Sequence, residues 1–145
     1  MAGLIVFLVA LFLVLGGAAV GFGLWLHGKG VAGRAELDAE LATEPALLGP
    51  ERGVYRGSTG SYSKVMGNGT IVLTARRVIF RKATGGRVDV SLADVSRIDQ
   101  QKVFNRGVVG TRIHLVLHTS HGDVGYFVTD PDAWAAAVGT AVAAA

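Results

Sequence analysis

The sequence contains no cysteine and only three prolines among its 145 residues. Without cysteine, disulfides, thiolate zinc sites and cysteine nucleophiles are all excluded. No Gly-x-Ser-x-Gly elbow is present, and the glycine pairs lie between predicted strands rather than between a strand and a helix. Neither a serine hydrolase nor a phosphate-binding loop is therefore predicted. We expect no catalytic residue, no cofactor and no metal.

Charge is also missing from the start of the chain, where residues 3–26 form an apolar run. As a helix rising 1.5 Å per residue, this run reaches about 36 Å, enough to cross a hydrocarbon core of about 30 Å. A secretory signal would need a positive start, a shorter apolar stretch and a small-residue cleavage site, and the sequence lacks these features. We therefore predict a retained transmembrane anchor over residues 1–27.

Gly17 and Gly21 stand four residues apart within this run. Small residues at that spacing let two membrane helices approach closely. The pair predicts a helix-packing contact, either with a larger membrane complex or with a second copy in a homodimer. The alternative is that these glycines have no special role, since glycine is common in membrane helices.

Positive charge is concentrated in the middle of the chain, where residues 51–112 hold twelve Lys and Arg against four Asp and Glu. Lys29 and Arg34 follow the apolar run, and only the amino terminus is charged before it. The positive-inside rule then places the N-terminus outside and the remaining chain in the cytoplasm. A basic domain held there faces the anionic leaflet. We predict a single-pass protein of the plasma membrane, with anionic lipid as a candidate partner.

Residues 28–49 form a predicted connector, and Pro50 marks the start of a single domain over residues 50–145. Leu37 and Leu41 are one helical turn apart, so the connector could form a short amphipathic helix interrupted at Pro45. A solvated spacer is the interpretation we favour.

The domain shows the short β-branched and aromatic runs that are typical of strands, separated by glycine-rich turns. Asp130 and Pro131 then provide a helix start, and Trp134, Val138, Ala141 and Val142 follow at helical spacing. A mainly-β, partly open barrel of about seven strands capped by a C-terminal α-helix would bury both apolar faces. The predicted strands cover residues 53–56, 70–73, 78–80, 88–92, 95–102, 113–118 and 123–128.

Three stretches resemble pleckstrin-homology-like (PH-like) domains, in particular the GRAM-like and bacterial members. Residues 69–80 resemble the pattern G-x-L-x-L-T-x-x-R-L-I-F, and residues 90–98 resemble I-P-L-x-D-I-x-x-V. Residues 125–134 are similar to the closing strand and helix of that fold. The resemblance implies a binding or docking module, often at membranes, without catalytic residues. The sequence departs from this family around Lys64, because Lys64 is isolated and the Lys/Arg cluster that holds phosphoinositides in such domains is absent.

Two groups of basic residues are candidates for a membrane or partner surface. The first flanks the Gly85-Gly86 turn and consists of Arg81, Lys82 and Arg87. The second surrounds an apolar set that includes Phe104, and consists of Lys102, Arg106 and Arg112. Cations beside insertable apolar groups suit an anionic interface. The alternative for the second group is a solvated loop with Phe104 directed into the core.

The histidines suggest a metal site only at first sight. His114 and His118 would share one face of a strand about 13 Å apart, too far to share a zinc ion with bonds of about 2.1 Å. We expect them on an exposed face. Nucleic acid is not predicted as a partner, because no aromatic stacking series or recognition motif accompanies the basic residues.

Two functions of different classes follow from these observations. In the first, the chain is a non-catalytic accessory or assembly subunit that docks on a membrane protein complex. In the second, it is a peripheral module whose basic face senses anionic lipid. Both would act at the membrane through binding.

Overall fold

The computed structural model describes residues 18, 20, 22–25, 28 and 31–145. The predicted anchor over residues 1–27 falls largely outside this part of the chain, and Gly17 and Gly21 lie wholly outside it. Within the described residues, no helix combines the length and the apolar character needed to cross a membrane.

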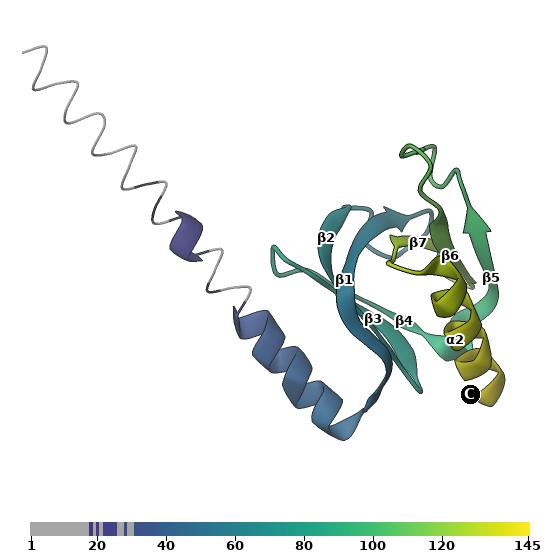
Figure 1. Cartoon of the computed structure of the whole chain (residues 1–145), viewed down its shortest axis with the longest axis horizontal. Helices are drawn as coiled ribbons and strands as arrows, with labels where there is room; N and C mark the ends of the chain where they lie inside the picture. The colour runs from purple at the N-terminus through teal and green to yellow at the C-terminus, as the bar shows by residue number, and fades with distance from the viewer. Residues whose placement is uncertain (1–17, 19, 21, 26–27, 29–30) are drawn as a thin grey trace, which may run out of the picture.

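The domain consists of one open antiparallel sheet of seven strands and a C-terminal helix (Figure 1). The strand order is β4-β3-β2-β1-β7-β6-β5, so β4 and β5 form the two edges. A 3-10 turn over Leu92–Asp94 connects those edge strands. The strands are β1 (Ala46–Ser58), β2 (Gly67–Thr74), β3 (Arg77–Lys82), β4 (Arg87–Ser91), β5 (Val95–Gln101), β6 (His114–Thr119) and β7 (Gly122–Phe127). The prediction of about seven strands is confirmed.

Strand β1 holds the two halves of the sheet together. Its 13 residues pair with β2 from Ala46 to Tyr55 and with β7 from Val54 to Ser58, and the register shifts along both pairings. Sequence patterning predicted only residues 53–56, since Gly49, Pro50 and Gly57 interrupt the apolar alternation. The predicted boundary at Pro50 lies inside this strand. The sheet begins at Ala46, which pairs with Thr74.

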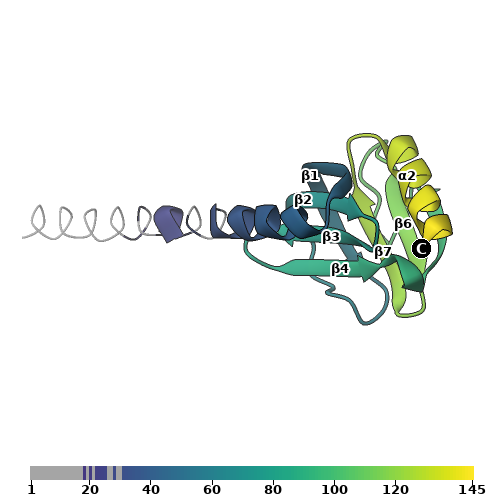
Figure 2. The ribbon, with the colours of Figure 1, turned by 90° about the horizontal axis from the view of Figure 1, so that it is seen from below.

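The main core lies between the curved sheet and helix α2 (Pro131–Ala144), which covers its inner face (Figure 2). Asp130 caps this helix as predicted, because its carboxylate accepts a hydrogen bond of 3.1 Å from the Ala133 amide. Trp134, Val138 and Ala141 are buried as predicted, and Val142 is partly buried against the same core. The indole Nε1 of Trp134 donates a hydrogen bond of 2.8 Å to Glu51 on β1, so the polar end of this buried ring is satisfied.

The connector differs from the expected solvated spacer. Residues 31–43 are helical and lie on the outer side of β2 and β3, opposite the side that α2 covers (Figure 1). Leu37 is 4% exposed and packs with Val72 and Ile79, which are also buried. Leu41 and Ala46 extend this second apolar cluster. The amphipathic-helix alternative was therefore the correct description of this segment.

Candidate interaction surfaces

The helix over residues 31–43 matches the repeat of the strand beneath it. Glu36, Glu40 and Glu44 recur every four residues, which corresponds to about 6 Å along a helix. Outward-facing residues on a strand recur every two residues, or about 6.6 Å. Arg77 and Arg81 occupy such outward positions on β3, on either side of Ile79. The glutamates of the helix and the arginines of β3 therefore have nearly the same spacing and can pair.

The contacts follow this register. A carboxylate oxygen of Glu44 lies 2.8 Å from the Arg77 guanidinium, and one of Glu36 lies 2.8 Å from that of Arg81, although the latter contact lacks hydrogen-bond alignment. Between them, Glu40 accepts a hydrogen bond of 2.7 Å from Arg87. Asp89 bonds both Arg77 and Arg87 at 2.8 Å. We call Arg77, Arg81 and Arg87 with their acidic partners the docked face.

The network shifts the pKa values of its members. Hydrogen bonds from Arg87 lower the pKa of Glu40, and hydrogen bonds from Arg77 lower that of Glu44, in both cases against the opposing effect of burial. The pKa values of Arg77 and Arg87 are raised in turn by their carboxylate partners. Since the side chains are only partly exposed, these ion pairs are less screened than ordinary surface pairs.

The first predicted surface group is therefore not a free basic tip. Arg81 and Arg87 pair with the connector helix, and only 11% of the Arg81 side chain is exposed. Lys82 donates a hydrogen bond of 2.9 Å to Ser63 and lies over the Tyr55 ring, and burial lowers its pKa. The four-residue spacing of Glu36, Glu40 and Glu44 was the sequence signal for this pairing.

The second group lies on the loop between β5 and β6, where Phe104 is directed inward. Phe104 is 5% exposed, and a Cβ atom placed on Gly125 would be only 2.4 Å from its ring. A small bridge between Phe104 and Gly107 closes the turn at Asn105 and Arg106, both with positive φ. The core-directed alternative for Phe104 is correct, and this ring is not available to insert into a membrane.

His114 is not on an exposed face, because the same loop covers it. It is fully buried, and its ring centroid lies 4.4 Å from that of Phe127. Its Nδ1 is 3.1 Å from the carbonyl oxygen of Gln101, so Nδ1 carries the proton of the neutral ring and donates it. Burial lowers the His114 pKa, and the nearby charges of Arg56 and Arg112 lower it further.

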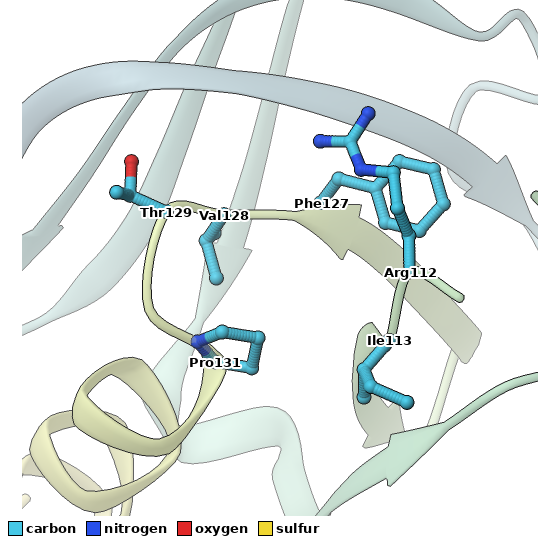
Figure 3. A pocket seen from close by; sticks show the side chains of 6 residues that line it. All are labelled: Arg112, Ile113, Phe127, Val128, Thr129 and Pro131. Atoms are coloured by element: carbon cyan, nitrogen blue, oxygen red, sulfur yellow. The ribbon is translucent and has the colours of Figure 1, made fainter. Parts of the chain in front are cut away.

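Those two arginines both contact Phe127. The guanidinium carbon of Arg112 lies 4.2 Å from the centre of the ring, and that of Arg56 lies 5.0 Å from it. Figure 3 shows Arg112 over the ring at the side of a hollow of about 330 Å³. Its lining has one ionisable side chain, Arg112, so it presents no acid–base pair. The lining residues are Arg112, Ile113, Phe127, Val128, Thr129 and Pro131.

Lys102, Arg106 and Arg112 are exposed, as a surface role requires. Within residues 31–145, which hold every acidic side chain of the protein, no carboxylate forms an ion pair with any of the three. The structure thus separates the two predicted groups: Arg81 and Arg87 of the first are paired with carboxylates, and the cations of the β5–β6 loop are not.

His118 has acidic neighbours that the sequence did not reveal in full. Its two ring nitrogens lie 2.8 Å from carboxylate oxygens of Asp99 and Asp123, of which Asp99 is 19 residues away in the chain. His121 lies 3.7 Å from Asp94 in a separate contact. Within the described part of the chain, no three His, Asp or Glu side chains are grouped so as to hold a metal ion.

Comparisons with known proteins assign no family. No family model and no curated protein matches the sequence. Among solved structures, the chain is similar to the C-terminal domain of an unknown protein from Leishmania infantum, with a TM-score of 0.44 and 13% identity, over 72% of this chain and 90% of that chain. A likeness at this level assigns neither the fold nor the function of this chain.

Proposed function

We propose that this chain is a non-catalytic single-pass membrane protein, with its N-terminus outside and a PH-like module held at the cytoplasmic face of the plasma membrane. Its role is that of an accessory or assembly subunit that docks on a membrane protein complex. The observation that carries this proposal is the docked face, which ties the connector to the sheet. A module fixed in this way to the segment after an anchor would hold a defined position relative to a neighbouring membrane protein.

Three further features support it. The apolar run and the two cations after it favour an anchor of this orientation. An open seven-stranded sheet with a C-terminal helix agrees with the resemblance to PH-like domains. The hollow beside Arg112 offers a cation and apolar groups, which suit binding better than catalysis.

Topology is tested with a reporter fused after Ala145. A reporter that works only in the cytoplasm should be active, and one that works only outside should be silent. The opposite result would contradict the orientation and the argument from the anionic leaflet.

Docking is tested by purifying the full chain from its native membranes and identifying the proteins that come with it. Replacing Gly17 and Gly21 together by Leu should preserve insertion and weaken association, because close helix approach is lost. Gly23→Leu is the matched control, since a residue two positions from Gly21 does not share a helix face with it. If the double variant and the control retain the same proteins, the anchor glycines do not form the contact.

The alternative is a peripheral module that senses anionic lipid. The unpaired cations Lys102, Arg106 and Arg112 favour it. Vesicle binding by the full chain that does not depend on anionic lipid would contradict this alternative and leave the docking role in place.

A further inference from the structure

Exposed apolar side chains are unevenly distributed over this protein. From residue 31 onward, seven large apolar side chains are exposed, and five of them lie in just two loops. Val65 and Met66 lie between β1 and β2, and Val103, Val108 and Val109 lie between β5 and β6. Scattered apolar groups on a surface need no explanation, but a concentration of them marks an interaction site.

The two loops converge beside β1. A Cβ atom on Gly57 would lie 3.1 Å from the carbonyl oxygen of Lys64 and 3.4 Å from the side-chain nitrogen of Asn105. These atoms belong to different loops, so both loops pack against the same point of the strand. Val65 and Met66 directly follow Lys64, and Val103 and Val108 stand close to Asn105 in the chain. The two loops that carry the five apolar side chains therefore meet at this point of the domain.

The same two loops carry four exposed cations. Lys64, Lys102, Arg106 and Arg112 are all exposed, and no carboxylate of residues 31–145 forms an ion pair with them. The contrast with the docked face is direct, because there every arginine contacts a carboxylate. We call these four cations, with Val65, Met66, Val103, Val108 and Val109, the loop surface.

The loop surface lies at the end of the sheet from which the chain arrives. Glu36, near the start of the helix, contacts Arg81, which pairs with Thr70 near the start of β2. Glu44, past the end of the helix, contacts Arg77 and Thr74 at the opposite end of these strands. Since Val65 and Met66 directly precede β2, they share the end of the sheet where the helix begins. In Figure 1 the loop between β5 and β6 lies at the top of the view, nearer to the level of the helix start than to that of the helix end.

We propose that the loop surface rests on an anionic phospholipid bilayer, in the membrane that holds the chain. The proposal rests on the proposed anchor and adds the face of the domain that meets the lipid. Four cations would contact phosphate groups, each contributing about fivefold to membrane affinity, and the valines and Met66 would enter the interfacial layer. Docking of the connector helix holds this face toward the side from which the anchor comes.

The absence of cysteine makes a direct test available, because any introduced cysteine is unique. The full chain is reconstituted in nanodiscs of phosphatidylcholine alone or with phosphatidylglycerol. Single spin labels are attached through Val65→Cys and Val108→Cys, and accessibility to oxygen is compared with accessibility to a water-soluble nickel chelate. Leu47→Cys is the control, because Leu47 is 58% exposed at the Thr74 end of the sheet. Val20→Cys reports insertion of the anchor.

We expect labels at positions 65 and 108 to favour oxygen in the discs with phosphatidylglycerol, whereas the label at 47 stays accessible to the chelate. Lys64→Glu combined with Lys102→Glu and Arg106→Glu should return both loop labels to water. Arg76→Glu should not, since Arg76 is an exposed cation at the opposite end of the sheet.

The outcomes separate this proposal from the proposed anchor. Loop labels in water while position 20 is in lipid would overturn the loop surface as a bilayer contact and leave the anchor intact. Loop labels in lipid while position 20 is in water would uphold the bilayer contact and refute the anchor. Loop labels that remain in water in nanodiscs and become immobile only in native membranes would overturn the bilayer contact and assign the surface to a protein partner.

Discussion

The docked face and the loop surface are two basic regions of one small domain that differ in how their charge is met. On the docked face, Arg77, Arg81 and Arg87 lie against carboxylates of the connector helix and of Asp89. On the loop surface, four exposed cations lie beside apolar side chains without such partners among residues 31–145. The first region contributes to the free energy of folding, and the second is available for binding. Charge composition alone does not distinguish them.

The largest effect on stability is expected from shortening Leu37, the apolar side chain that packs the connector helix against the sheet. Leu37→Ala should lower the free energy of unfolding by about 2–3 kcal/mol, because it leaves a cavity against Val72 and Ile79. Amide hydrogen exchange over residues 31–43 in the full chain should become much faster. Leu47→Ala is the control for an exposed leucine and should change the free energy by less than about 0.5 kcal/mol. Equal effects of the two variants would show that the helix is not held by Leu37.

Removing the central cation of the docked face should have the next largest effect. Arg77→Ala leaves Glu40, Glu44 and Asp89 without one of their partners, and hydrogen bonds to charged groups support a loss of about 1.5–2 kcal/mol. Arg76→Ala is the adjacent control, since Arg76 is exposed, forms no ion pair among the described residues and acts on Glu44 only through the weaker charge interaction. Urea unfolding of both variants measures the difference, and a similar stability would contradict the network.

Lowering the pH should destabilise the docked face and not the loop surface, because of these two regions only the docked face depends on carboxylates. Glu40 and Glu44 have pKa values below the ordinary 4.5, held there by Arg87 and Arg77. The folded state therefore binds protons less readily than the unfolded state, so this stabilisation is complete above about pH 4.5 and is lost as the pH falls through the lowered pKa values. We expect a loss of about 1 kcal/mol from these two groups.

The measurement is the free energy of unfolding between pH 6 and pH 3, for the unmodified protein and for the double variant Glu40→Gln with Glu44→Gln. The double variant should be less stable at pH 6 and should show a shallower decline. Parallel curves for the two proteins would contradict the assignment.

The smallest effect on stability is expected at the loop surface. Changing Lys102, Arg106 and Arg112 to Glu together should alter the free energy of unfolding by about 0.5 kcal/mol or less at each of Lys102 and Arg106. At Arg112 the change should reach about 1 kcal/mol, because its contact with the Phe127 ring is lost. Binding of the full chain to anionic vesicles should fall nonetheless, since three of the four exposed cations are reversed. Thermal unfolding and vesicle flotation measure the two quantities side by side. A large loss of stability would place these cations with the docked face.

Much of the sheet was predictable from short local runs of β-branched and aromatic residues between turns. Alternation marked the runs that became β4 and β6, whereas β2 and β3 were continuous apolar runs whose residues are buried on both faces of the sheet. Strand β1 was underestimated, because Gly49 and Pro50 interrupt the pattern where the chain bends across both halves of the sheet. His114 was assigned to the wrong environment for a related reason. Alternation assigns a residue to a face of the sheet, and a loop then covered that face.

The sequence by itself determined the strands, the C-terminal helix with its Asp130 cap, and the excess of cations over residues 51–112, since each depends on neighbouring residues. Only the tertiary structure decided which cations are neutralised. Arg77 and Glu44 are 33 residues apart in the chain, and their contact exists because the connector helix packs Leu37 onto the outer side of the sheet. Four residues of the helix and two residues of the strand span similar lengths, so the glutamates of the helix meet the arginines of β3. The cations of the loops form no ion pair with that helix.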